Sequence, residues 1–166
     1  MSRLSPTLLA GHLSCGHLTQ LERKHKAGEL AVEFNADPRL EAMRLRGQQH
    51  EARYVERLRA ERHEVCDLRG ERDPAVTREA MQRGCGVIVQ APLANESFFG
   101  YADVLLRVPR PSALGDYSYE PVDTKLALDT KAGTILQLCT YCELLTSMQG
   151  AQPDRFHVVT PLGEES

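Results

Sequence analysis

The chain has 166 residues, of which 42% are hydrophobic and 26% charged, enough for one domain with its own core. Its net charge of −3 argues against a protein that binds nucleic acid through bulk positive charge, although a local basic groove stays open. No apolar run approaches the roughly 18 residues that span a bilayer, and the N-terminal segment contains His12 and lacks a signal-peptide cleavage site. Five irregularly spaced cysteines predict no disulfide framework and favour a reducing, cytoplasmic setting.

The first half of the chain is predicted to be mostly helical. Residues 4–29 indicate two short helices, the first capped by Ser5 with Pro6 in its first turn, the second from near Thr19 to Gly28. The NADPRL segment should be a loop that leads into a long helix over residues 39–63. Apolar residues at three- and four-residue steps predict one buried stripe on that helix, formed by Leu40, Met43, Gly47, Tyr54 and Leu58.

The second half changes to the period of two that is typical of strands. After a short strand or loop at 64–74 and a helix at 77–84 closed by Gly84, strands are predicted at 86–93, 98–108, 119–127 and 156–161, the first two antiparallel. A helix at 134–150 precedes the last strand. The order predicts one α/β domain over residues 1–166, with a helical region at 1–84 and the core sheet and helix at 86–161. The polar GEES end suggests a natural chain that continues.

The third predicted strand carries an acid and a base side by side. Asp123 and Lys125 are two residues apart, so their side chains share one face of a strand. An exposed ion pair is the simple alternative, because such pairs are common and contribute little. Asp103 lies on the preceding strand, three residues after Gly100, whose missing side chain suggests close approach of another group. Converging carboxylates and a lysine are suited to phosphodiester hydrolysis with a divalent cation.

These motifs in this order resemble the PD-(D/E)XK nuclease superfamily, and within it the RecB-like branch. The resemblance rests on Asp103, Asp123-x-Lys125 and Gln137-x-x-x-Tyr141, and on RGQQHE at residues 46–51. It implies a restriction-endonuclease-like αβββαβ core with N-terminal helices. It also implies that Mg²⁺ or Mn²⁺ is held by Asp103, Asp123 and either Glu51, which is preferred, or His50, with the Thr124 carbonyl as a further candidate ligand.

The resemblance also implies roles for the remaining motif residues. Lys125 would assist the attacking water, and Gln137 and Tyr141 would contact DNA or brace the site. Each residue has a structural alternative: Glu51 on an Arg- and Glu-rich helix is often a solvated ion-pair partner, and Gln137 and Tyr141 at helical spacing fit the edge of a core. Asp103 alone would be a strand-end or turn residue.

The cysteines suggest a further possibility. Cys15 resembles the first cysteine of related iron–sulfur nucleases, but a four-cysteine cluster would need further cysteines from a missing C-terminal region. Cys139 and Cys142, in the middle of a predicted helix, are expected to be buried thiols rather than a metal site.

The functional hypothesis is therefore a Mg²⁺- or Mn²⁺-dependent deoxyribonuclease, by preference an exonuclease, that acts on single-stranded DNA or linear ends in repair or recombination, with a helicase as a possible partner. Two alternatives stay open. One is a catalytically silent DNA- or protein-binding module of the same fold, and the other is a fragment of an iron–sulfur nuclease.

Overall fold

A computed structural model describes residues 3–31, 37–61 and 63–166. Within these ranges the chain forms five helices, α1 (Pro6–Ser14), α2 (Gly16–Lys26), α3 (Pro38–Ala60), α4 (Pro74–Gln82) and α5 (Ala132–Gln149). It also forms six strands, β1 (Val65–Asp67), β2 (Val87–Ala94), β3 (Phe99–Val108), β4 (Ser118–Thr124), β5 (His157–Thr160) and β6 (Gly163–Glu165). Asn35 and Ala36 of the expected NADPRL loop and Arg62 of the expected long helix lie outside the described residues. None of the helices in these ranges combines the length and apolarity needed to cross a membrane.

The six strands make one mixed sheet whose spatial order follows the sequence, which confirms an α/β fold. The pairs β1·β2 and β4·β5 are parallel, whereas β2·β3, β3·β4 and β5·β6 are antiparallel. The predicted antiparallel pairing of the first two long strands is therefore confirmed. The final GEES segment is not simply a polar end, because residues 163–165 pair with β5 as an edge strand.

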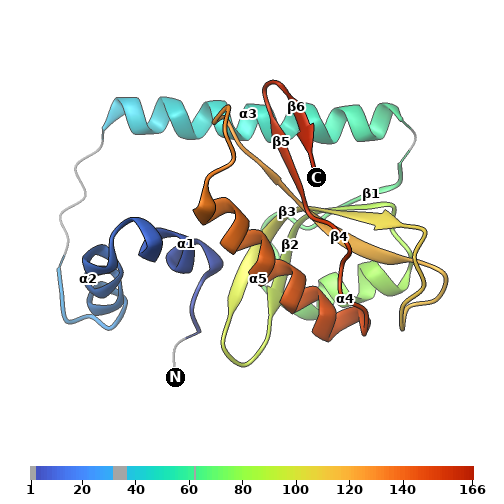
Figure 1. The fold of residues 1–166 in the computed structure, drawn as a ribbon, viewed down its shortest axis with the longest axis horizontal. Coiled ribbons are helices and arrows are strands. Elements are labelled where there is room, and N and C mark those ends of the chain that lie inside the picture. The colour runs from blue at the N-terminus through green and yellow to red at the C-terminus, as the bar shows by residue number, and fades with distance from the viewer. Residues whose placement is uncertain (1–2, 32–36, 62) are drawn as a thin grey trace.

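Helices cover both faces of the sheet (Figure 1). One core cluster joins the sheet to α4 and α5 and includes Met81, Leu138 and Leu144. A second cluster joins the opposite face to the C-terminal half of α3. The parallel step from β4 to β5 passes through α5, so β4, α5 and β5 form one crossover unit and fix β4 in the interior of the sheet.

Local capping explains where several helices begin and end. The Ser5 hydroxyl accepts a hydrogen bond from the Leu8 amide at 3.1 Å, as the sequence predicts. Gly84 and Gly150 follow α4 and α5 with φ of 75° and 68°, a conformation that favours glycine at helix ends. The second helix begins at Gly16 with Cys15 as its cap, so the predicted start near Thr19 was wrong by three residues.

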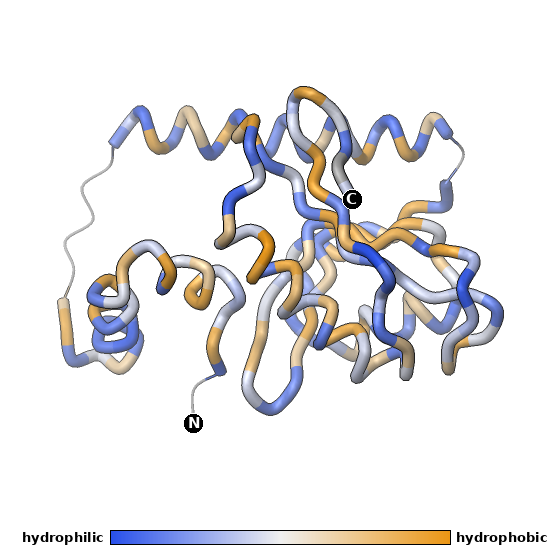
Figure 2. Tube along the Cα trace, viewed as in Figure 1, coloured by the Kyte–Doolittle hydropathy of each residue, from blue (hydrophilic) through white to orange (hydrophobic). Residues whose placement is uncertain are grey.

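The buried stripe predicted along the long helix is wrong over its N-terminal half. Leu40 and Met43 are 65% and 62% exposed, and burial on α3 is confined to Tyr54, Val55 and Leu58. Hydrophobic residues recur along the whole of α3, including the half that extends beyond the sheet (Figures 1 and 2). The apolar period predicted the helix correctly, but it carried no information on whether a partner lies opposite each turn.

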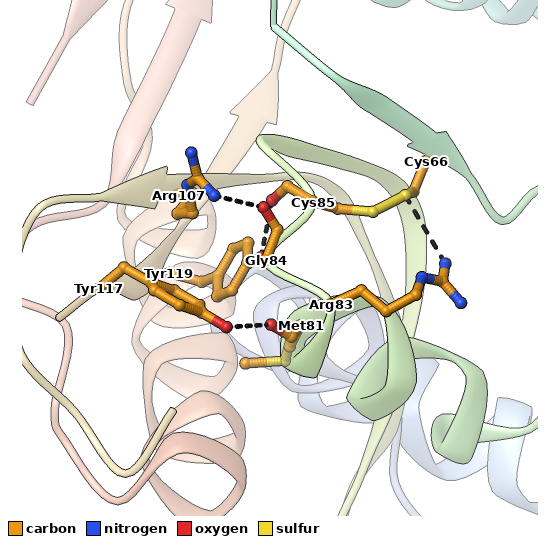
Figure 3. Close-up of a disulfide and its surroundings, with 8 residues drawn as sticks. All are labelled: Cys66, Met81, Arg83, Gly84, Cys85, Arg107, Tyr117 and Tyr119. Atoms are coloured by element: carbon orange, nitrogen blue, oxygen red, sulfur yellow. Dashed lines mark hydrogen bonds between the residues drawn. A yellow bond between two sulfur atoms is a disulfide. The ribbon is translucent and has the colours of Figure 1, made fainter. Parts of the chain in front are cut away.

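The cysteine prediction also needs correction. Cys66 on β1 and Cys85, just before β2, form a disulfide with their Cα atoms 6.2 Å apart (Figure 3). Cysteine usage therefore gives no argument for a reducing setting. Cys139 is exposed and Cys142 half-buried, so the expectation that both thiols pack inside the core was wrong for Cys139.

Gly100 is a point of close approach, as its place in a strand predicts. A Cβ atom on this residue would lie 2.7 Å from Cδ of Pro6 and 3.3 Å from Cε1 of Tyr141. We expect Gly100→Ala to push α1 away from β3 and to lower the free energy of unfolding by about 1–3 kcal/mol.

Urea unfolding measures this change, with Gly47→Ala as the control. A Cβ on Gly47 meets nothing within 4 Å, so that helical substitution should stabilise by roughly 0.5–1 kcal/mol. Equal effects of the two variants would contradict the packing argument.

Candidate active site

A row of polar residues crosses the centre of the sheet. The pairs Val89↔Val104 and Ala91↔Ala102 place Gln90 of β2 opposite Asp103 of β3. The pair Val104↔Val122 places Asp103 in turn opposite Asp123 of β4, one step further along. Directly opposed residues of antiparallel strands have side chains about 5 Å apart. Two like-charged carboxylates opposite each other oppose folding, so this row needs a compensating group or a functional reason.

The row lies where the alternation of the strands breaks. On a regular strand, residues three apart face opposite sides, yet Ile88 and Ala91 belong to the same core cluster, as do Ala102 and Leu105. The backbone of Gln90 has a φ angle of +52°, which residues other than glycine rarely adopt. Such conformations often concentrate at functional sites, where the surrounding structure holds them. This break in the alternation lets the polar side chains point away from the packed core.

Asp123 and Lys125 form a close ion pair. The Lys125 ammonium lies 2.9 Å from Oδ1 and 2.8 Å from Oδ2 of Asp123, and it donates a hydrogen bond to Oδ1. Oδ2 is buried and has no hydrogen-bond partner among the described residues. Lys125 lies just after β4 rather than within it, and its amide donates to the Val159 carbonyl of β5 at 2.9 Å. The pair is partly buried, since the side chains are 2% and 35% exposed, so it is not the ordinary surface ion pair.

Asp103 joins the same site through Thr124. Its Oδ2 accepts hydrogen bonds from the Thr124 amide at 3.0 Å and from the Thr124 hydroxyl at 3.3 Å. These bonds orient the Asp103 carboxylate toward the end of β4, beside Asp123. The Thr124 residue therefore supports an acid through its amide and hydroxyl, whereas its predicted role as a carbonyl ligand stays a prediction.

Glu51 of α3 reaches the carboxylates through Gln90. The Gln90 amide nitrogen donates to both Glu51 oxygens at 3.1 Å and lies 3.5 Å from Oδ1 of Asp103. His50 instead places Nε2 3.0 Å from the Val159 carbonyl, so the structure brings Glu51 to the carboxylates and His50 to the main chain of β5. Gln90 was not among the predicted site residues. Its only sequence mark is a single polar residue inside the apolar run GVIVQAPL.

The electrostatics of the site reflect crowded negative charge. Burial, followed by the charge of Asp103, raises the pKa of Asp123 from 3.8 to about 6, against the opposing effect of Lys125. Burial and the Asp103 charge also raise the pKa of Glu51, although Gln90 and Arg69 act in the other direction. The negative charge of Asp103 thus raises the pKa of both Glu51 and Asp123, and a bound positive charge would offset this repulsion.

Gln137 and Tyr141 lie behind this row on α5. The Tyr141 hydroxyl donates to the Tyr101 carbonyl of β3 at 2.6 Å, and the Gln137 amide nitrogen lies 3.4 Å from that hydroxyl. Tyr141 is 2% exposed, and burial raises the pKa of its hydroxyl well above the usual range. This contact holds the segment of β3 two residues before Asp103, which is the geometry of a bracing residue, and a contact of Gln137 or Tyr141 with DNA stays a prediction.

The donor set fits a hard divalent cation, which prefers carboxylate oxygens. The raised pKa values of Asp123 and Glu51 are what such an ion would lower, although the Lys125 ammonium already lies 2.8 Å from Oδ2 of Asp123. Glu51, Asp103 and Asp123 are not, however, within 4.8 Å of one another. In the described ranges, the one group of three residues whose ligand atoms lie within this distance is Glu64, Cys66 and Cys85. The two cysteines of that group are joined as a disulfide. The three carboxylates would hold one ion only after their side chains move closer together.

The iron–sulfur candidate gains no partner in the structure. Cys15 caps α2, where its sulfur accepts a hydrogen bond from the Leu18 amide at 3.4 Å. Within the described ranges, neither Cys15 nor the pair Cys139 and Cys142 belongs to a group of three close metal-ligating side chains. An iron–sulfur cluster therefore stays a prediction that depends on residues beyond this set.

No family model, curated protein or solved structure matches the chain.

Proposed function

We propose that this protein is a metal-dependent nuclease that hydrolyses phosphodiester bonds in DNA with Mg²⁺ or Mn²⁺. The observation that carries the proposal is the buried Asp123, paired with Lys125 and placed opposite Asp103. The fold adds support, because three antiparallel strands followed by a crossover helix and a parallel strand are compatible with the αβββαβ core of the PD-(D/E)XK nucleases, and the RecB-like branch stays a prediction. Exonuclease action, a role in repair or recombination and a helicase partner stay predictions.

The carboxylates would hold the cation. Asp123 and Asp103 provide oxygens from adjacent strands, and Glu51 provides oxygens from α3. Once bound, a divalent ion supplies Lewis-acid stabilisation of the phosphate and a water molecule with a lowered pKa. Gln90 holds Glu51 and Asp103 in their relative positions, because its amide nitrogen contacts both carboxylates.

Lys125 has a separate role. Its ammonium lies against Asp123 and remains one-third exposed, so it faces both the acid and incoming substrate. From that position it would orient the attacking water and stabilise the negative charge that develops on the phosphate. A compact ammonium suits this task better than a guanidinium, whose rigid fork would demand a different geometry.

A specific observation favours one second candidate, a DNA-binding module of the same fold without turnover. The described carboxylates do not form a closed set of three metal ligands, and Lys125 occupies the space beside both Asp123 oxygens. A protein that had given up catalysis would keep such an ion pair. This candidate predicts DNA binding that is independent of divalent cations.

Cleavage assays separate the two candidates. The purified chain is incubated with end-labelled linear single-stranded and duplex DNA, and with circular single-stranded DNA, in Mg²⁺, Mn²⁺ or EDTA. The nuclease proposal predicts cleavage of linear DNA in Mg²⁺ or Mn²⁺ and none in EDTA. Resistance of the circle would identify exonuclease action. Binding to DNA without cleavage under every metal condition would overturn the nuclease proposal and support the binding module.

A further inference from the structure

A cleft of about 670 Å³ opens beside the carboxylate row. Four separate parts of the chain form its walls: α3, the turn after β1, β2 and β3. The side chains that matter here are Gln48, Glu51, Arg69, Arg72, Gln90 and Tyr101. Because Glu51 and Gln90 belong to both the cleft and the carboxylate site, a ligand that fills the cleft leads directly to the proposed reaction centre.

Two arginines on the turn after β1 give the cleft its phosphate-binding capacity. Arg69 is half exposed and lies 3.6 Å from Glu51 and 3.1 Å from Asp67. Arg72 is exposed and, in the described ranges, has no ion-pair or hydrogen-bond partner. Glu71 also lines the cleft and offsets part of this charge. Arg72 is therefore the cation most available to an incoming phosphate, with Arg69 held partly by acids of the protein itself.

Tyr101 adds an aromatic surface. Its ring packs edge-on against Phe99, with the centroids 5.3 Å apart and the planes at 86°. Its main chain is fixed from behind by the hydroxyl of Tyr141, and it lies two residues before Asp103. A rigid, half-buried aromatic side chain in a cleft with arginines is the combination that binds unpaired bases by stacking, independently of sequence.

We propose that this cleft binds single-stranded DNA on its way to the carboxylates, with Arg72 and Arg69 on phosphates and Tyr101 stacked against an unpaired base. This inference rests on the proposed function for its direction, because the strand is placed relative to the site of hydrolysis. Tyr101 discriminates against duplex DNA, since the faces of paired bases are covered by their neighbours in the stack. The cleft thus selects single strands before any bond is cleaved.

Fluorescence anisotropy in EDTA tests the cleft without cleavage, with a labelled oligothymidylate of about 16 nucleotides and a duplex of the same length. Wild type should bind the single strand more tightly than the duplex. Tyr101→Ala should weaken single-strand binding by roughly 5- to 150-fold, as the loss of one stacked base predicts. Tyr101→Phe, which keeps the ring, should restore it. Arg72→Ala should weaken binding to both DNAs and reduce the salt dependence for single strands by about 0.7 in the logarithmic slope.

The control is Arg78→Ala on α4, an exposed arginine that does not line the cleft and should leave both affinities unchanged. The proposal would be overturned if Arg72→Ala and Tyr101→Ala bound single strands as tightly as wild type. It would also be overturned if Tyr101→Phe lost as much single-strand affinity as Tyr101→Ala. Failure of the nuclease proposal has a different appearance: the wild type would bind single strands with the predicted dependence on Tyr101 and yet cleave nothing in Mg²⁺ or Mn²⁺.

Discussion

Lys125→Ala is expected to lower the rate of metal-dependent DNA cleavage by about 10²- to 10⁴-fold, the range that positioned proton-transfer and charge-stabilising groups contribute. Lys125 is the described cation in contact with the Asp123 carboxylate, and it is one-third exposed toward substrate. Its loss removes the group that is proposed to orient the attacking water. It also removes the positive charge that lies against Asp123. Single-turnover assays with linear single-stranded DNA in Mg²⁺ measure the change.

Two further variants make the result specific. Lys131→Ala removes an exposed lysine at the start of α5. The side chain of Lys131 makes no capping hydrogen bond to this helix, so the cleavage rate should stay at the wild-type level. Asp103→Asn keeps the shape of a proposed metal ligand and should reduce the rate at least as much as Lys125→Ala. Lys125→Ala with wild-type activity would make the pair with Asp123 a structural ion pair and remove the catalytic assignment.

Features with local causes could be predicted from the sequence. Ser5 and Pro6 fix the start of α1 through a hydrogen bond three residues away, and Gly150 ends α5 because its backbone adopts a left-handed conformation. The spacing of Asp123 and Lys125 predicted their contact correctly, although β4 ends at Thr124 and Lys125 follows the strand instead of lying within it. Gly100 predicted close approach correctly, although the sequence did not identify Pro6 as the neighbour.

Features with long-range causes could not be predicted. The apolar pattern of α3 is continuous, but Leu40 is exposed because, among the described residues, neither core cluster includes a residue from that half of the helix. Gln90 is one polar residue in an otherwise apolar predicted strand, and only the fold places it beside Asp103 and Glu51. Cys66 and Cys85 are brought together by the parallel pairing of β1 with β2, which the spacing of the cysteines does not encode.

Asp123→Asn is expected to stabilise the metal-free protein by about 3 kcal/mol above pH 6. The folded state raises the pKa of Asp123 from 3.8 to about 6, so folded protein holds this proton more tightly than unfolded protein. Wild-type stability attributable to Asp123 therefore falls as the pH rises from about 4 to 6, with the full cost present above the upper value. A difference of roughly two pKa units corresponds to about 3 kcal/mol of unfolding free energy. The asparagine side chain is neutral and therefore does not carry this cost.

Urea unfolding in EDTA at pH 4 and pH 7 measures this effect. The gain for Asp123→Asn over wild type should be small at pH 4 and near its full value at pH 7, whereas Asp116→Asn, an exposed carboxylate on the loop before β4, should show little change at either pH. Saturating Mg²⁺ should then stabilise wild type and not the variant, because a bound cation offsets the same crowded charge that the amide removes. A loss of stability in Asp123→Asn at pH 7 would mean that the attraction between Asp123 and Lys125 outweighs burial and the repulsion from Asp103. The Asp123 carboxylate would then stabilise the metal-free protein through its ion pair with Lys125.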